Sequence, residues 1–215
     1  MHVIEETDAF TLVGVDAKLG KLTLFAADGP RSRGALERVV LRVQDLDAAL
    51  ERLPIDQADI ERLPPVDARL ERLPDDVDPR GGSAAFDAPE GLRIGLVQGP
   101  GRDYDVDHVV LRLPDPDSAS AALAAMGFER RDGRLAVADR HVRVEPGEAD
   151  DSGSPLLNHI ALLVDSARDV QERAETQGFE IDDVKDAPNT LAVFLRGPAG
   201  VRIEYVEHKP GFALV

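Results

Sequence analysis

The feature that most constrains this chain is an internal repeat. A stretch of alternating apolar residues that contains His108 begins near residue 106, and a similar stretch that contains His159 begins near residue 157. In both copies the same number of residues separates the histidine from a Gly-Phe-Glu triplet. This interval has a strand pattern, a helix with an N-terminal capping residue, and a glycine at the helix end. Further strand patterns follow each triplet, so each copy predicts a βαβββ unit.

A third copy of the unit lies earlier in the chain. Residues 36–43 have the pattern of the opening strand, with Arg38 at the position of the histidine. The copy ends in a strand in which Gly95 stands where the last copy has Glu204. This copy therefore keeps the fold signals without the candidate ligands. Residues 10–28 predict a hairpin, which we interpret as the remnant of a first unit without its opening strand and helix.

The repeat predicts an α+β fold in which βαβββ units form the domain. Gly99-Pro100-Gly101 is the best candidate for a linker, so we expect two halves. Residues 1–100 would form an incomplete pair of units without metal ligands, and residues 101–215 a pair that carries the site. Residues 51–74 contain Glu-Arg-Leu-Pro three times at a ten-residue period. Because proline interrupts a helix, we expect short helical turns in a surface insertion near residues 54–80, with no assigned function.

Composition excludes several classes of function. The formal net charge is −16, so nucleic acid and anionic membranes would repel the protein, and neither is expected as a partner. The chain has no cysteine, which excludes thiol catalysis, thiolate-bound zinc and disulfides. The first residues lack a signal-peptide pattern, and no apolar run approaches the length of a membrane span. We therefore expect a soluble cytoplasmic protein.

The repeated histidines are the best candidates for chemistry. A single histidine on an apolar strand is most often a hydrogen-bonded structural residue, but His108 and His159 occupy equivalent positions of a repeat. Glu204 and Glu145 lie on the last strands of the two units, where a carboxylate on an apolar strand needs a partner or a metal ion. The alternative partners are the arginines two residues earlier in each strand, Arg202 and Arg143.

These motifs resemble the vicinal oxygen chelate superfamily, which includes glyoxalase I, bleomycin resistance proteins and extradiol dioxygenases. The resemblance covers residues 10–208 and rests on three stretches, which are Asp107-His108-Val109, Asn158-His159-Ile160 and the segment from Gly197 to Glu204. It implies cupped, incomplete β-barrels with helices packed outside, and one divalent metal ion on the inner face. The implied ligands are His108, His159 and Glu204, with Glu145 as a fourth candidate.

The resemblance leaves three functions open. Two histidines and one glutamate with Fe²⁺ or Mn²⁺ would suit an extradiol-type dioxygenase that binds a small oxygen-chelating substrate. However, the extradiol enzymes have a substrate-binding tyrosine where this chain has Phe194. Glu145 as a fourth ligand would suit a glyoxalase-type lyase or isomerase, in which Zn²⁺ or Ni²⁺ is possible. The third function is a metal-free, bleomycin-resistance-like binding protein.

Two further expectations complete the sequence interpretation. His208 would share a face with Glu204 if the last strand continues, which makes it a candidate acid or base, although a solvated histidine is the simpler interpretation. The expected partner is a small molecule. A monomer and a homodimer are both compatible with the sequence.

Overall fold

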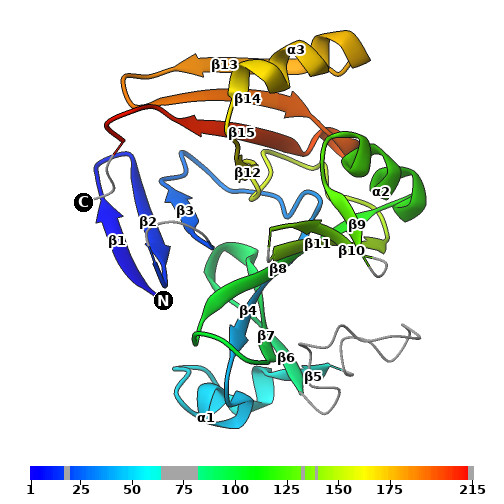
Figure 1. The fold of residues 1–215 in the computed structure, drawn as a ribbon. Coiled ribbons are helices and arrows are strands. Elements are labelled where there is room, and N and C mark those ends of the chain that lie inside the picture. The colour runs from blue at the N-terminus through cyan, green and yellow to red at the C-terminus, as the bar shows by residue number, and fades with distance from the viewer. Residues whose placement is uncertain (17–19, 64–81, 132–133, 139, 213–215) are drawn as a thin grey trace.

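The computed structural model describes residues 1–16, 20–63, 82–131, 134–138 and 140–212. Within these residues, three α-helices and three short 3-10 helices accompany fifteen strands, which form three curved sheets that do not close into a barrel (Figure 1). The predicted α+β fold of cupped βαβββ units is confirmed. The helices are α1 (Leu46–Glu51), α2 (Pro116–Ala125) and α3 (Ala167–Gln177).

The largest sheet has eight strands and joins the second and third units of the repeat. Its order is β5 (Glu61–Leu63), β6 (Ser83–Asp87), β7 (Arg93–Gln98), β4 (Leu36–Val43), β8 (Asp105–Leu113), β11 (Arg140–Pro146), β10 (Arg134–Val137) and β9 (Glu129–Arg131). At its centre the opening strands β4 and β8 run antiparallel, with Val39 opposite Val109. Each opening strand pairs in parallel with the last strand of its own unit, β4 with β7 and β8 with β11.

Two smaller sheets contain the remaining units. The fourth unit forms a four-stranded sheet in the order β12 (Ile160–Leu163), β15 (Arg202–His208), β14 (Thr190–Arg196) and β13 (Ile181–Asp186). The first unit is a three-stranded sheet of β1 (His2–Glu6), β2 (Phe10–Gly14) and β3 (Leu22–Phe25). The predicted hairpin at residues 10–28 is β2 and β3, and β1 adds a strand to it.

Helix capping confirms the alignment of the repeat. The N-cap side chains accept a hydrogen bond from a backbone N–H of the first turn, as is typical of Asp and Ser at this position. Each N-cap lies seven residues after the equivalent opening-strand residue, which gives the pairs Arg38 and Asp45, His108 and Asp115, and His159 and Ser166.

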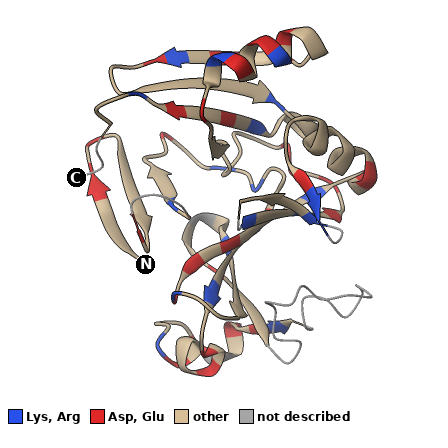
Figure 2. Ribbon diagram, viewed as in Figure 1, with Lys and Arg blue, Asp and Glu red and all other residues tan. Residues whose placement is uncertain are grey.

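The core lies between the helices and the outer faces of the sheets. One cluster packs α2 and α3 together and joins the third and fourth units, with Leu123 and Ile203 completely buried in it. A second cluster packs α1 against β4 and β7. Charges of both signs lie along α3, whereas α2 is mainly uncharged (Figure 2). In the part of the chain that the structure describes, no helix is long and apolar enough to cross a membrane.

The structure differs from the expected pairing of units. We expected the third and fourth units to share the site, but the eight-stranded sheet joins the second unit to the third across the predicted linker at Gly99–Gly101. The division into halves at residues 1–100 and 101–215 stays a prediction. In the insertion, the second Glu-Arg-Leu-Pro copy forms edge strand β5 rather than a helical turn, and residues 64–81 lie outside the described residues.

Candidate functional site

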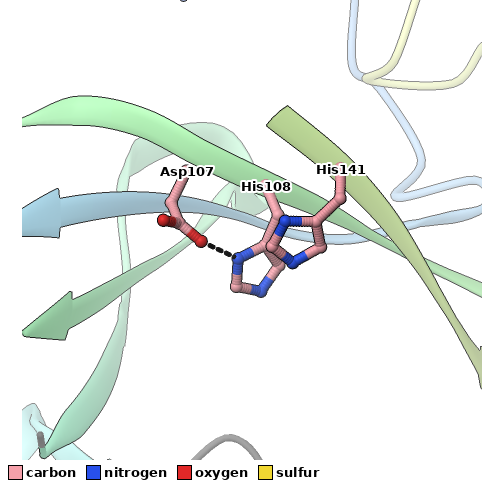
Figure 3. Close-up of side chains that lie close together, drawn as sticks. All are labelled: Asp107, His108 and His141. Carbon is pink, nitrogen blue, oxygen red and sulfur yellow. Dashed lines mark hydrogen bonds and ion pairs between the residues drawn. The ribbon is translucent and has the colours of Figure 1, made fainter. Parts of the chain in front are cut away.

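His108 lies at the centre of the eight-stranded sheet and is 2% exposed. Its Nδ1 is 2.6 Å from the Oδ1 of Asp107 (Figure 3), and Arg42 on β4 donates from Nε to the Oδ2 of Asp107 at 2.7 Å. Asp107 is the additional residue of a β-bulge, because Val40 pairs with His108 while the next residue of β4 pairs with Val106. Since a carboxylate only accepts hydrogen bonds, Nδ1 of His108 carries the proton.

His141 on β11 lies directly beside His108 in the parallel ladder. The two rings are stacked, with centroids 4.5 Å apart and planes 16° from parallel (Figure 3). Burial and the neighbouring His108 lower the pKa of His141 to about 3. Burial also lowers the pKa of His108, against the opposing effect of Asp107. Both rings are therefore neutral at neutral pH.

Asp107 remains ionised beside these two rings. Burial alone would raise the pKa of its carboxyl, but the hydrogen bond from His108 and the charge of Arg42 hold it well below its usual range. The ligand atoms of Asp107, His108 and His141 lie within 4.8 Å of one another, close enough to hold a metal ion.

This cluster fits a cation poorly in the observed arrangement. Both oxygens of Asp107 are already engaged, one by His108 and one by Arg42. The ring lone pairs lie in nearly parallel planes and do not converge on one point. The positive charges of Arg38 and Arg143 also act on His108. The three residues are therefore best described as a buried polar cluster that holds the centre of the sheet.

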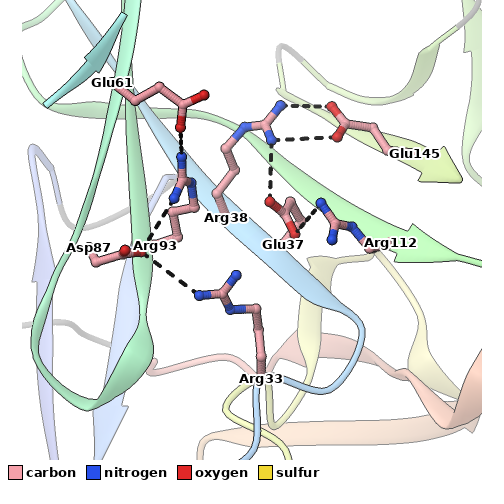
Figure 4. A network of polar contacts seen from close by, with 8 residues as sticks. All are labelled: Arg33, Glu37, Arg38, Glu61, Asp87, Arg93, Arg112 and Glu145. Atoms are coloured by element: carbon pink, nitrogen blue, oxygen red, sulfur yellow. Dashed lines mark hydrogen bonds and ion pairs between the residues drawn. The ribbon is translucent and has the colours of Figure 1, made fainter. Parts of the chain in front are cut away.

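Glu145 lies on the same sheet but is bound by an arginine. The Nη2 of Arg38 is 2.7 Å from the Oε1 of Glu145, and the second guanidinium nitrogen is 3.5 Å from its other oxygen. Arg38 also contacts Glu37, which in turn pairs with Arg112 (Figure 4). The guanidinium thus neutralises the carboxylate that was the predicted fourth ligand.

The strand register shows that Glu145 is not the structural equivalent of Glu204. In the fourth unit Ala161, two residues after His159, pairs with Glu204. In the third unit the residue two positions after His108 pairs with Arg143. The residue equivalent to Glu204 is therefore an arginine, and Glu145 lies two positions further along the strand.

His159 and Glu204 form a second group on the four-stranded sheet. The Nε2 of His159 is 3.1 Å from the Oε2 of Glu204, and each side chain is 17% exposed. The Nδ1 of His159 is 2.8 Å from the Oδ1 of Asn158, so both ring nitrogens have an oxygen neighbour. Phe194 lies opposite Glu204 on β14, and its ring is perpendicular to that of His159 with centroids 5.6 Å apart.

Glu204 does not pair with the arginine considered in the sequence interpretation. The Nε of Arg202 is instead 2.6 Å from an oxygen of Asp182, and its guanidinium lies over the ring of Phe194. His159 is the partner of Glu204 in the described structure. The pair combines a nitrogen and an oxygen ligand type and remains partly open to solvent.

Solved structures with the same fold were found, although no protein-family model matches the sequence and no curated protein sequence matches it significantly. A "putative dioxygenase" from Bacillus subtilis aligns with a TM-score of 0.65 at 18% identity, over 95% of this chain and 74% of its own. A glyoxalase I variant from Zea mays aligns with a TM-score of 0.66 at 15% identity, over 96% of this chain and 84% of its own. Unmodified glyoxalase I from Zea mays aligns with a TM-score of 0.59 at 16% identity, over 92% of this chain and 78% of its own.

Both kinds of protein are members of one superfamily. This chain has the fold of the vicinal oxygen chelate superfamily. At these identities the likeness shows the fold alone, so the chemistry has to be argued from the residues.

In this vicinal oxygen chelate fold the four predicted ligands fall into two groups. His108 and Glu145 lie on the eight-stranded sheet, and His159 and Glu204 lie on the four-stranded sheet. Among the described residues, the one group of three or more ligand atoms close enough for a metal ion does not include His159, Glu204 or Glu145. The structure therefore assembles one predicted pair and separates it from the other two residues.

His208 is distant from the His159 and Glu204 pair. It ends β15, four residues beyond Glu204, which corresponds to about 13 Å along a strand. Its ring is stacked on that of Phe212 at 3.6 Å between centroids. Burial and the charge of Lys21 lower its pKa. Direct proton transfer between His208 and a group bound at Glu204 would require a movement of the strand or a chain of water molecules.

The sequence interpretation overlooked Asp107 and His141 as members of a cluster. His141 is partly buried, with its ring against that of His108. The signal that could have found it is the parallel pairing of the first and last strands of each unit, which brings two histidines of the third unit side by side.

Proposed function

We propose that this chain binds a divalent metal ion through His159 and Glu204 and acts on a small substrate that chelates the ion with two oxygens. The observation that supports the proposal is the 3.1 Å distance from Nε2 of His159 to Oε2 of Glu204. Histidine nitrogens and carboxylate oxygens bind such ions at about 2.0–2.2 Å, so two ligands at a right angle lie about 3 Å apart. The residues therefore fit the ion.

The hydrogen bond to Asn158 also supports a cation at this place. Because Oδ1 of Asn158 is an acceptor, Nδ1 of His159 carries a proton and Nε2 of a neutral ring presents its lone pair to the carboxylate. Metal-bound histidines typically bind the ion through one ring nitrogen and donate from the other to a protein oxygen, which is the arrangement that Asn158 and His159 offer here.

The surroundings assign roles to the residues of this chain. Asn158 fixes the orientation of the His159 ring, and the rings of Phe194 and Phe25 flank it, at 5.6 and 6.3 Å between centroids. These apolar neighbours reduce the access of water to one side of the pair. A bound ion would supply Lewis-acid activation of the substrate oxygens, and two protein ligands leave several positions for them.

The position of Glu145 favours a dioxygenase-type function over a glyoxalase-type one. The glyoxalase-type hypothesis requires Glu145 as a fourth ligand, but Arg38 holds that carboxylate on the other sheet. Fe²⁺ or Mn²⁺ is therefore the preferred ion of the proposal, and Zn²⁺ and Ni²⁺ are the alternatives for an isomerase or lyase.

A metal-free binding protein is the second candidate function. The eight-stranded sheet favours it, because Arg38 neutralises Glu145 and Asp107 holds His108, which leaves the predicted ligands of that sheet engaged with protein groups. In this function the cups would bind a small molecule without a metal ion. A bleomycin-resistance-like protein is the model for this hypothesis.

Elemental analysis of matched variants tests the proposal. The protein is purified without chelator, incubated anaerobically with Fe²⁺, Mn²⁺, Zn²⁺ or Ni²⁺, desalted and analysed. We expect one ion per chain in the unmodified protein and in Glu145→Gln, and its loss in Glu204→Gln and His159→Ala. Oxygen uptake with a catechol by the iron or manganese form would then identify the dioxygenase-type reaction. No ion in any protein would refute the proposal and leave the metal-free binding protein.

A further inference from the structure

Two of the open sheet edges, those of β3 and β12, are equivalent to strand sides that are covered in the eight-stranded sheet. Strand β3 ends the three-stranded sheet and β12 ends the four-stranded sheet, and no strand of the described residues lies on the outer side of either. In the eight-stranded sheet the equivalent strands are β7 and β8, and β4 lies between them. There β4 runs parallel to β7 and antiparallel to β8.

The equivalence of these strands follows from the repeat. A glycine with positive φ precedes the last strand of three units, with Gly20 (φ 65°) before β3, Gly91 (φ 76°) before β7 and Gly200 (φ 75°) before β15. Each last strand begins two residues after this glycine. Strand β12 is equivalent to β8 because both are opening strands, followed by a helix whose N-cap lies at the same distance from the equivalent histidine.

Equivalent side chains differ in exposure in the way that a vacant strand position would produce. Phe25 on β3 is 50% exposed, whereas its equivalent on β7, Leu96, is 1% exposed beneath α1. Ala161 on β12 is exposed, whereas its equivalent on β8, Val110, is completely buried. Leu24 on β3 is 48% exposed, whereas its equivalent on β7, Gly95, is buried. The apolar surface uncovered here is the surface that β4 and α1 cover in the other sheet.

The two edges lie near each other. The ring of Phe25, the last residue of β3, is 6.3 Å from the ring of His159, which directly precedes β12. A strand between two others requires about 9.6 Å from one neighbour to the next, and aromatic side chains extend far enough to meet across that width. In Figure 1, β3 lies near β12, which is the edge strand of the four-stranded sheet.

We propose that the edges of β3 and β12 bind a strand–helix segment of a partner polypeptide. Its strand runs parallel to β3 and antiparallel to β12, and its apolar helix face covers Phe25. The chemistry of the segment is that of β4 with α1 or β8 with α2, namely an alternating apolar strand of about eight residues followed by a capped helix. Main-chain hydrogen bonds to both edges supply affinity, and the uncovered apolar side chains supply specificity.

This segment would also complete the site, a step that rests on the proposed function. On β4 the residue at the repeat position of His159 is Arg38, which pairs with Val110 across the ladder. A residue at that position of an added strand would pair with Ala161 and lie on the same face as Glu204. A histidine there would provide a third ligand beside His159 and Glu204, whereas an arginine would neutralise Glu204 as Arg38 neutralises Glu145.

Binding of synthetic peptides to the whole chain tests the inference. The probe is a fluorescent peptide of residues 105–126, which contains His108, and the matched peptide has His108→Ala. In the absence of metal we expect both peptides to bind equally, with slower amide exchange in β3 and β12. With Co²⁺ we expect the histidine peptide alone to increase metal affinity by about tenfold or more, the scale of the loss when a metal ligand is left without support.

Surface variants identify the edge that the peptide uses. Leu24→Lys places a charge at the proposed contact, because its equivalent Gly95 lies against Val40 of β4, and it should weaken peptide binding by about tenfold or more. Val184→Lys is the control, because Val184 is 41% exposed on β13, at the edge of the four-stranded sheet opposite to β12, and it should bind the peptide normally.

The outcomes separate this inference from the proposed function. Peptide binding without metal, lost in Leu24→Lys, supports the strand position even if no ion ever binds His159 and Glu204. Absence of peptide binding, or protection confined to β13, would refute it. Sedimentation of the protein alone is the second measurement, and a dimer that Leu24→Lys converts to monomer would show that a second copy occupies the edge and would overturn the assignment to a separate partner.

Discussion

Replacement of His141 should change the acid stability of the protein by an amount that can be calculated. The pKa of His141 is lowered from 6.5 to about 3 in the folded state, mainly by burial and then by His108. Between these two values the unfolded chain binds a proton that the folded chain does not, so stability rises with pH in this window. The contribution is complete above pH 6.5 and is lost as the pH falls towards 3.

The expected magnitude at pH 5 follows from the same pKa values. For one group with a pKa of 6.5 when unfolded and about 3 when folded, the free energy of unfolding at pH 5 is about 2 kcal/mol lower than at pH 8. His141→Gln removes this titration while keeping a side chain of similar polarity. Its loss of stability from pH 8 to pH 5 should therefore be about 2 kcal/mol smaller than that of the unmodified protein.

Urea unfolding of both proteins at pH 8 and pH 5 provides the measurement. The comparison uses the difference between the two pH values, so a general destabilisation by the lost ring stack cancels. His2→Gln on the exposed strand β1 is the control for removal of a histidine as such. If His141→Gln and the unmodified protein lose the same stability between pH 8 and pH 5, the assignment of His141 as a buried neutral ring is wrong.

Three further substitutions test the packing that positions the site. Leu123→Ala empties a completely buried position on α2 and should lower the free energy of unfolding by about 2–5 kcal/mol in urea titrations. Tyr205→Phe removes the hydrogen bond that the hydroxyl donates to the carbonyl of Met126, and should lower the free energy of unfolding by about 1 kcal/mol. Burial raises the pKa of Tyr205 to about 12, so the absorbance change of this tyrosine should be missing when the variant is titrated with alkali. Glu207→Gln replaces the carboxylate that accepts a hydrogen bond from the N–H of Ala167 at the start of α3. The free energy of unfolding in urea should fall by about 0.3–1 kcal/mol, and the loss should be smaller at high salt.

The elements that depend on local sequence could be predicted from the sequence. The capped helices that the repeat predicts are present, with Asp115 and Ser166 as N-caps and Asp45 in the earlier copy, because N-cap hydrogen bonds involve only neighbouring residues. Period-two alternation puts Tyr205 on the face opposite to Glu204, and its side chain is buried towards the helix layer.

The pairing of the units could not be predicted, because it depends on contacts between distant residues. Any opening strand of the repeat offers a similar apolar edge, so the sequence alone does not decide whether β8 pairs with β4 or with β12. The choice made in the structure places His108 and His159 in different sheets. This single difference separates the predicted ligands into two groups.

Register explains the other difference, the role of Glu145. Glu145 and Arg143 are two positions apart on β11 and share a face, so alternation cannot distinguish them. The parallel ladder with β8 places Arg143 at the position of Glu204, and Glu145 two pairs further, where Arg38 reaches it from β4. A sequence alignment of the repeat needs the strand pairing before it can assign equivalent residues.

The two sheets show how one repeated unit supports different chemistry. At the equivalent positions of the opening strand and the last strand, the second unit has Arg38 and Gly95, and the fourth unit has His159 and Glu204. Where two units pair, an arginine from one neutralises a glutamate of the other, and the inner face is buried. Where no strand of the described residues lies beside β12, the carboxylate of Glu204 faces His159 rather than an arginine, and the face stays partly open. The open edge and the unneutralised carboxylate therefore have one cause, and this is why the vacant strand position and the metal ion are best tested on the same protein.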